Sequence, residues 1–519
     1  MSLLRNFATV GSATAASRVL GFVRDMLMAA ALGTGPVADA FFVAFRFPNL
    51  FRRLFAEGAF NSAFIPLFAR KLEGESEDAA RQFAIEALSG LLLALLVLTA
   101  VAEVAMPLLM FVLAPGFYKD PDKFDLAVML TRVCFPYLTF VSMLALVSGV
   151  LNALGRFAVA AFAPVLLNVV LIATLTLVVA LGYANTPAAG YWLSGGVFLG
   201  GVVQLAAVVY ELYRSGWVLI PQRPRYTEGV RRLVRLSIPA VIAGGITQIN
   251  IVIGTMIASM AAGAVSYLYY ADRVYQLPLG IVGIAIGVVL LPDLSRRLRA
   301  GNEEAASGQQ NRALEFAMVL TLPAAAALFT VSGPIIAGLF ERGAFDAAAT
   351  ARTAPALAAF ALGLPAFVMI KVFSPGFFAR EDTRTPMWFA AINAIINVVL
   401  SLALFPFLQH IGIALATTVG GWVNATLLGL TLYRRKHFLP DERLRRRTTG
   451  AAAASGAMVM ALIVSSVIFA VWAGETASLA GNILHLAVLT VVGLAAYAAA
   501  AVMLGVISRA ELTGFVRRG

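Results

Sequence analysis

The sequence is poor in the residues that build most enzyme centres. It has one cysteine, Cys134, and three histidines among 519 residues. A single cysteine excludes an internal disulfide and a metal site made of several cysteines. The histidines lie far apart in the sequence, so we expect no metal centre. We find no nucleophile paired with a base, no pair of acid/base carboxylates and no glycine-rich phosphate loop, and therefore expect a protein that is not an enzyme.

Charged residues are also scarce. They make up 13% of the chain, and 60% of it is hydrophobic, whereas soluble domains are about 25% charged. Apolar stretches of about 20 residues recur, each long enough to cross a bilayer as a helix, and the alternation of a barrel is absent. We therefore predict an all-α polytopic membrane protein. About fourteen transmembrane helices are expected, at 6–32, 37–67, 83–113, 125–152, 160–182, 189–213, 233–262, 266–294, 311–340, 350–378, 386–406, 411–433, 450–473 and 482–507.

Lysine and arginine are distributed unevenly between the two sides of this topology. With the N-terminus in the cytoplasm, the cytoplasmic segments hold 27 of the 39 basic residues, the outer segments hold four, and the remaining eight are intramembrane. This positive-inside bias predicts that both termini are cytoplasmic. It also accounts for the net charge of +12, because anionic headgroups meet the basic loops and no nucleic acid is needed as a partner.

Prolines recur in the same order in two halves of the chain. The gaps between them are 18, 41 and 29 residues in one half and 14, 42 and 31 in the other, for Pro48, Pro66, Pro107 and Pro136 against Pro278, Pro292, Pro334 and Pro365. The letters NVVL follow the last proline of each set by 32 residues. This duplication predicts two parallel six-helix lobes, 1–222 and 223–440, with a site between them. Two additional helices in 441–519 lie outside the repeat.

Charged residues interrupt the first two apolar segments. Arg18, Arg24 and Asp25 lie in the first, and Asp39 and Arg52 lie in the second. A charge facing lipid at mid-bilayer costs about 2.5–3.5 kcal/mol even on the lenient insertion scale. We therefore expect these side chains to line a polar cavity, and a cationic lining predicts an anionic cargo. Arg18 and Asp25, seven residues apart, share a helix face.

Helix 266–294 is, by the duplication, the partner of helix 37–67. It carries Arg273, so it brings a cation to the same central space as Arg52. The polar residues expected to support these cations are Ser17, Asn49, Arg53, Glu57, Ser266 and Asp272. Arg53 and Glu57 are spaced for an ion pair within one helix.

Four other polar residues in predicted helices leave two interpretations open. Asn393 and Asn397, at i and i+4, can coordinate a cation or bridge helices by hydrogen bonds. Arg132 and Lys371 can either have a functional role or form hydrogen bonds to backbone carbonyls.

Four segments resemble the MurJ/MviN family, lipid II flippases of the multidrug/oligosaccharidyl-lipid/polysaccharide exporter superfamily. They are SRVLGFVRD at 17–25, DAFFVAFRFPNLFRRLFAEGAF at 39–60, YYADRVYQLPLG at 269–280 and KVFSPGFFAREDTRTP at 371–386. The resemblance implies a two-lobe bundle in the bacterial inner membrane that moves undecaprenyl-pyrophosphate-linked MurNAc(pentapeptide)-GlcNAc to the periplasmic leaflet. It implies that the functional residues are Arg18, Arg24, Arg52 and Arg273, with Asp25 and Asp39 as acidic partners.

The resemblance also bears on coupling and partners. Some members carry a sodium site with an acidic residue, whose counterparts here are the neutral Asn393 and Asn397. No cofactor is expected, and either Na⁺ or the membrane potential drives the cycle. Expected partners are lipid II, membrane lipids and proteins of cell-wall synthesis, and the last two helices are expected to form a groove for the lipid tail.

Arginine's planar fork suits phosphate, so we hypothesise that Arg24, Arg52 and Arg273 hold the diphosphate during alternating access. The alternatives are another lipid-linked oligosaccharide flippase, a cation-coupled multidrug exporter, whose cavity would be acidic, and an enzyme acting on polyprenyl-phosphate sugars.

Overall fold

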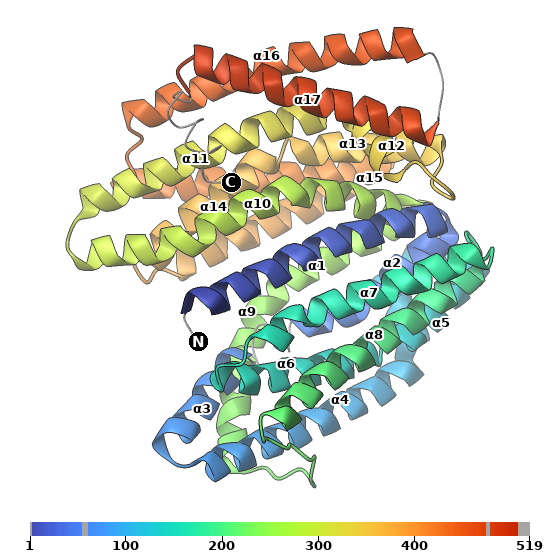
Figure 1. Ribbon diagram of the computed structural model, residues 1–519, viewed down its shortest axis with the longest axis vertical. Helices are drawn as coiled ribbons and strands as arrows, with labels where there is room; N and C mark the ends of the chain where they lie inside the picture. Colours follow the sequence, from blue (N-terminus) through green and yellow to red (C-terminus); the bar gives the residue numbers. More distant parts are fainter. Residues whose placement is uncertain (1–2, 54–60, 474–477, 507–519) are drawn as a thin grey trace. The chain divides into compact units, whose positions relative to one another are not determined.

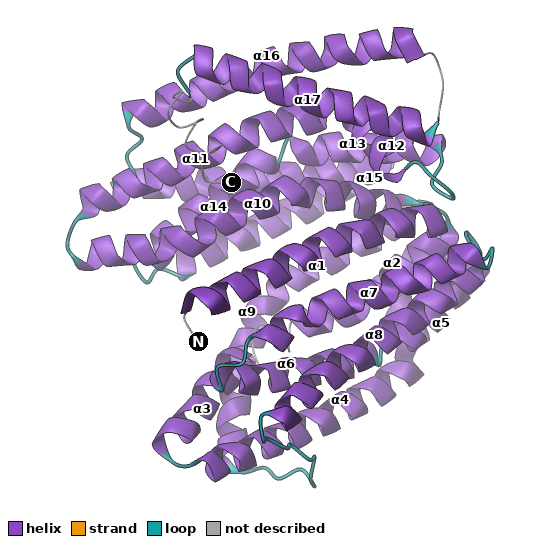
Figure 2. Ribbon diagram, in the orientation of Figure 1, coloured by secondary structure: helices purple, strands orange, loops and turns teal. Residues whose placement is uncertain are grey.

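The computed structural model describes residues 3–53, 61–473 and 478–506. These residues form seventeen α-helices and one 3-10 helix, with no β-strand among them (Figure 2). The prediction of an all-α protein is confirmed. Nine segments of the described chain are long and apolar enough to cross a membrane, judged by length and composition.

The chain divides into two compact units, 1–266 and 267–519. The first unit is built from ten helices (Figure 1), which are α1 (Leu3–Leu32), α2 (Pro36–Phe51), α3 (Asn61–Gly74), α4 (Glu77–Leu113), η2 (Pro115–Lys119), α5 (Pro121–Cys134), α6 (Tyr137–Ala153), α7 (Ala158–Ala180), α8 (Pro187–Arg214) and α9 (Glu228–Ser259). In this unit α1 packs on α7, α7 packs on α8, and α9 packs on α4. The predicted lobe boundary at 222 falls before α9, whereas the compact units divide after α9.

The second unit contains the remaining helices. They are α10 (Ala264–Arg299), whose first three residues belong to the first unit, then α11 (Glu303–Thr330), α12 (Ser332–Phe340), α13 (Ala347–Ala361), α14 (Leu364–Phe378), α15 (Arg384–Arg434), α16 (Glu442–Ala473) and α17 (Leu479–Met503). α16 and α17 pack side by side (Figure 1) and lie against α11 and α12 respectively. The Tyr497 hydroxyl of α17 donates to the Val319 carbonyl of α11 at 2.6 Å.

Helix boundaries follow local chemistry. Ser76, Asp120 and Asp346 each accept a hydrogen bond from the backbone N–H three residues on, at the starts of α4, α5 and α13. Such caps satisfy donors that have no partner inside the helix. Proline at the first helical turn, as in α5, needs no donor there.

Three predicted helices are each divided in two within the described residues. Segment 125–152 breaks at Phe135–Pro136 into α5 and α6, and segment 350–378 breaks at 362–363, just before Pro365, into α13 and α14. These breaks stand at matching prolines of the duplication, and proline lacks the N–H that would continue the ladder. Segment 311–340 is divided into α11 and α12, and segment 37–67 contains α2 and the start of α3 on either side of residues that lie outside the described part. The predicted helices 386–406 and 411–433 both fall within α15, which consists of two helices separated by non-helical backbone at Gln409 (φ 48°, ψ −129°), so their separation is confirmed.

Candidate functional site

Arg24 is a buried cation in α1, held by residues from two helices. Its Nε and Nη2 donate to Oδ1 of the adjacent Asp25 at 3.1 and 2.8 Å. Its Nη1 donates to Oδ1 of Asn168 in α7 at 3.0 Å. Asn168 in turn donates to the Ser17 carbonyl at 3.0 Å and lies against Gly21. Arg24 is 9% exposed and Asp25 3%, so the guanidinium is fixed in one orientation.

Arg18 and Asp25 were predicted to share a helix face, but the hydrogen-bonding partner of Asp25 on α1 is Arg24. Asp25 pairs with its sequence neighbour Arg24 although adjacent helical positions point about 100° apart, because the long guanidinium side chain reaches back to the carboxylate. Arg18 itself is exposed, and Ser17 is half-buried.

Arg52 stands where α2 ends. Its Nε donates to Oδ1 of Asn49 at 3.1 Å, and the Asn49 amide donates to the Phe45 carbonyl at 2.8 Å. Pro48, inside the same turn, removes one backbone donor from the helix. The predicted support of Arg52 by Asn49 is seen here as a direct hydrogen bond. Arg53 is exposed, and Glu57 lies outside the described residues, so their pairing stays a prediction.

Asp39, in α2, is fully enclosed by donors of the first unit. Its Oδ2 accepts from Lys123 Nζ at 2.6 Å and from the Gly263 N–H at 2.9 Å. Its Oδ1 accepts from the Ser266 N–H at 3.0 Å and hydroxyl at 2.6 Å. The carboxylate thus sits at the N-terminus of α10, where the helix dipole favours negative charge. The Lys123 ammonium also lies 4.1 Å from the centre of the Phe117 ring.

This burial bears on the expected role of Asp39. The side chain has 0% exposure, so contact between Asp39 and a cargo requires the cluster of Asp39, Lys123, Gly263 and Ser266 to separate. In the arrangement described here, Asp39 and Ser266 hold the first turn of α10.

Arg273, in α10, belongs to the second unit. Its guanidinium lies over the ring of Tyr269, 4.7 Å from the ring centre, one helical turn earlier. Asp272 accepts a hydrogen bond from Gln276. Arg273 is half-buried, and an aromatic face is a favourable neighbour for a cation. That Arg273 acts with Arg24 and Arg52 on one diphosphate stays a prediction.

The two candidate ion-site residues lie in α15. Asn397 donates to Thr417 Oγ1 at 3.0 Å and accepts from Ser401 Oγ at 3.3 Å. Asn393 lies so close to Gly420 that a Cβ there would be 2.3 Å from its Oδ1. These contacts join the two parts of α15 on either side of its kink. The set contains no carboxylate to balance a cation, so it fits a helix bridge better than a sodium site.

The sequence does not announce the roles of Asn168 and Lys123, because Asn168 stands out only as a repeat marker and Lys123 only as an outer-loop lysine. For Arg132, one of the two predicted alternatives is confirmed. Arg132 Nε donates to the Glu103 backbone carbonyl at 3.2 Å, which is the carbonyl-bonding alternative. The duplication pairs Asn168 with Asn397, and both turn out to join helices.

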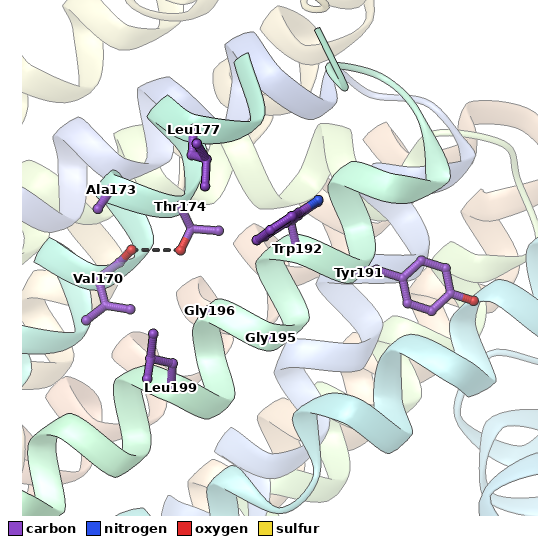
Figure 3. A pocket seen from close by; sticks show the side chains of 9 residues that line it. All are labelled: Val170, Ala173, Thr174, Leu177, Tyr191, Trp192, Gly195, Gly196 and Leu199. Atoms are coloured by element: carbon purple, nitrogen blue, oxygen red, sulfur yellow. Dashed lines mark hydrogen bonds between the residues drawn. The ribbon is translucent and has the colours of Figure 1, made fainter. Parts of the chain in front are cut away.

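A groove between α7 and α8 is lined mainly by apolar side chains of the first unit. It has a volume of about 590 Å³ and is lined by Val170, Ala173, Thr174, Leu177, Tyr191, Trp192, Gly195, Gly196 and Leu199 (Figure 3). The Thr174 hydroxyl donates to the Val170 carbonyl at 2.9 Å. No lining residue is charged, so the groove offers no cation to an anionic group.

Comparison with known proteins identifies the family of this chain. A sequence model described as "Lipid II flippase MurJ" matches residues 28–506. The chain belongs to the MurJ family. A protein of Rhizobium meliloti (strain 1021) named "Probable lipid II flippase MurJ" is 51% identical over 520 residues, covering 100% of this chain and 97% of the relative. A Burkholderia cenocepacia protein named "Lipid II flippase MurJ" is 38% identical over 447 residues, covering 85% and 86%.

Solved structures agree with the family. The structure titled "Lipid II flippase MurJ, inward closed conformation" matches with a TM-score of 0.79 and 25% identity, covering 95% of this chain and 98% of that one. An inward-facing MATE multidrug transporter matches with a TM-score of 0.67 at 17% identity, covering 81% and 94%, which shows a shared fold. The chain is thus a multi-pass membrane protein of a transporter family, not an enzyme, and the rival functions are not favoured.

Proposed function

We propose that this protein moves lipid II, the undecaprenyl-pyrophosphate-linked peptidoglycan precursor, from the cytoplasmic to the periplasmic leaflet. The observation that carries the proposal is the buried Arg24, held by Asp25 and Asn168 within an apolar helix. Membership of the MurJ family supports the cargo.

The chemistry of Arg24 suits a diphosphate. A guanidinium presents a rigid planar fork that matches phosphate oxygens and stays charged. Asp25 and Asn168 hold this fork in place before the cargo arrives, which lowers the entropy lost on binding. Arg52, oriented by Asn49, and Arg273, set over Tyr269, supply further cations, and Arg18 lies six residues before Arg24 on α1.

We infer that transport proceeds by alternating access, with the polyprenyl tail left in lipid. The Asp39 cluster closes around the start of α10 in the described state, and release of α10 from Asp39 is a step that the cycle requires. The cationic site makes the return of the empty carrier sensitive to voltage, at about 2.3 kcal/mol per charge per 100 mV.

The proposed location is the bacterial inner membrane, with both termini in the cytoplasm. The 27-to-4 distribution of basic residues between cytoplasmic and outer segments supports this orientation. We propose that the membrane potential drives the cycle rather than Na⁺, because the Asn393 and Asn397 carboxamides bring no carboxylate to a cation.

Depletion of the protein in its host tests the proposed function. We expect lipid II to accumulate on the inner leaflet, and re-expression of the wild type, but not of Arg24→Ala at equal protein level, to clear it. Accumulation of another lipid-linked sugar, with lipid II distributed normally, would contradict the proposal.

A further inference from the structure

Lys371 interrupts a helix that is otherwise packed into the second unit. Of residues 364–377 in α14, Lys371 alone has an exposed side chain; the others are buried or half-buried. α14 forms the second part of a segment, Ala347–Phe378, that is long and apolar enough to cross the membrane. An ammonium that faced lipid here would be costly, so the opening that exposes Lys371 is expected to be polar.

The position of the Lys371 side chain depends on a glycine of α10. A Cβ built on Gly283 would lie 2.8 Å from Cδ, 2.9 Å from Cε and 3.4 Å from Nζ of Lys371. The lysine stem therefore crosses α10 at a point where α10 has no side chain. The three atoms nearest to that Cβ all belong to Lys371.

This arrangement differs from snorkelling toward the membrane surface. Lys371 stands seven residues before the end of α14, which is about 10 Å along the axis. A snorkelling stem would follow its own helix toward that end, whereas this stem lies across a neighbouring helix. The Lys371 side chain instead passes Gly283 of α10, close enough for its Cδ and Cε to lie within 2.9 Å of a Cβ built there.

Gly283 follows Arg273 by ten residues on α10, about 15 Å along the axis. Two cations of different chemistry thus lie along one helix of the second unit. The arginine fork suits a diphosphate, and the compact ammonium of lysine suits a single carboxylate. Lipid II carries both groups, since its pyrophosphate is linked through a sugar to a peptide with free carboxylates.

We propose that Lys371 binds a carboxylate of the cargo's peptide, with Gly283 as a positioning residue that leaves room for its side chain. This inference rests on the proposed function and adds a second anionic subsite to it. Lys371 then helps to select cargo by its peptide, in addition to its diphosphate.

The test compares two cargoes in proteoliposomes, lipid II and lipid II whose peptide carboxylates have been converted to amides. We expect Lys371→Gln to lower the initial rate for lipid II about tenfold, the size expected for one charge-assisted hydrogen bond, and to leave the rate for the amidated cargo unchanged. Equal loss for both cargoes would indicate a structural role and overturn the inference, as would no loss for either. If the wild type moves neither cargo, the proposed function itself fails.

Gly283→Ala provides a second, independent variant. The added methyl meets the far end of a flexible side chain, so the fold should persist while Lys371 is displaced. We expect Gly283→Ala to slow lipid II and to add no further loss to Lys371→Gln, whereas additive losses would overturn the positioning role. Lys71→Gln, which breaks only an exposed pair with Glu75, is the matched control and should keep the wild-type rate. Size-exclusion chromatography checks that each variant is folded and monodisperse.

Discussion

Asn168 joins two helices that lie far apart in the sequence through one carboxamide. Its oxygen accepts from Arg24 and its nitrogen donates to the Ser17 carbonyl, so both ends of the amide are used on α1. Asn168 is 5% exposed, and a buried amide that loses its partner costs free energy comparable to a lost hydrogen bond. Asn168 therefore sets both the position of α1 on α7 and the orientation of the Arg24 guanidinium.

Asn168→Ala should reduce lipid II translocation about tenfold or more, because Arg24 loses the partner that orients it. The rate in proteoliposomes measures this effect. Thr174→Ala is the control and should leave the rate unchanged. Thr174 lies six residues further along α7, and its hydroxyl donates to the Val170 carbonyl within the same helix. Normal transport by Asn168→Ala would show that the orientation of Arg24 does not matter.

The sequence predicted that Arg24 and Asp25 could not face lipid, and both are buried. It could not predict the partners, because Asn168 is 144 residues from Arg24 and helical periodicity carries no information about which helices pack together. The same holds for Lys123, which meets Asp39 across 84 residues. Charge inside an apolar segment is a local signal, whereas the pairing of charges is a property of the packing.

Helix α16 is tied to α11 by a buried carboxylate. Glu315 of α11 is 4% exposed, and its Oε1 lies 2.7 Å from Arg447 Nη1 and 3.3 Å from Arg443 Nη2 of α16. Arg312, one turn earlier on α11, also pairs with Glu315. Three guanidinium groups thus share one carboxylate at this helix junction.

Glu315→Ala should lower the free energy of unfolding by about 2 kcal/mol, because the junction loses the charge-assisted hydrogen bonds of a buried carboxylate. The partly exposed arginines stay hydrated, and Arg312 keeps its pair with Asp441. Thermal unfolding in detergent measures the loss. Glu304→Ala, at an exposed position of the same helix, should cost less than about 1 kcal/mol. Similar small shifts for both variants would mean that Glu315 does not fasten α16 to α11.

The turn between α14 and α15 depends on the ionised form of Asp382. The Thr385 backbone N–H donates to Oδ1 at 3.0 Å, and Arg435 Nη1 lies 2.7 Å from Oδ2. The Thr385 N–H, with Arg435 and the Thr385 hydroxyl, lowers the pKa of Asp382 to about 2. Since the pKa is lower in the folded state than in the unfolded chain, the ionised carboxylate stabilises this turn.

Asp382→Asn should therefore be less stable than the wild type above pH 4, where the unfolded-state carboxyl is already ionised. The difference should shrink as the pH falls from about 4 toward 2, because the wild type then loses the advantage of its lowered pKa. The unfolding temperatures of the two proteins, measured side by side across this range, provide the test. A difference that stays constant with pH would contradict the role of the ionised form.

Helix breaks were harder to predict than helices. The duplication aligned Pro136 with Pro365, and the structure breaks its helices at both places. A proline in an apolar segment does not by itself say whether it kinks or ends the helix, because that depends on how neighbouring helices satisfy the freed carbonyl. The two predicted helices within α15 do meet at non-helical backbone, where Gln409 adopts a φ of 48°.

The whole chain combines an apolar composition with cations placed at a few defined points. Its fold class and family could be predicted from the sequence because hydropathy, the positive-inside bias and the segment 17–25 are all readable without packing. The division of the chain after Ser266 could not be predicted from the sequence, because it depends on the packing of α9 against α4. The central claim is that the cation held by Asp25 and Asn168 in α1 allows the protein to move a lipid-linked diphosphate.

The leaflet distribution of labelled lipid II in proteoliposomes tests that claim most directly. The account predicts that the wild type moves lipid II to the opposite leaflet, that Arg24→Ala does not at equal reconstitution, and that an unrelated lipid-linked sugar is not moved. Transport of lipid II by Arg24→Ala at the wild-type rate, or wild-type transport of the unrelated sugar but not of lipid II, would contradict it.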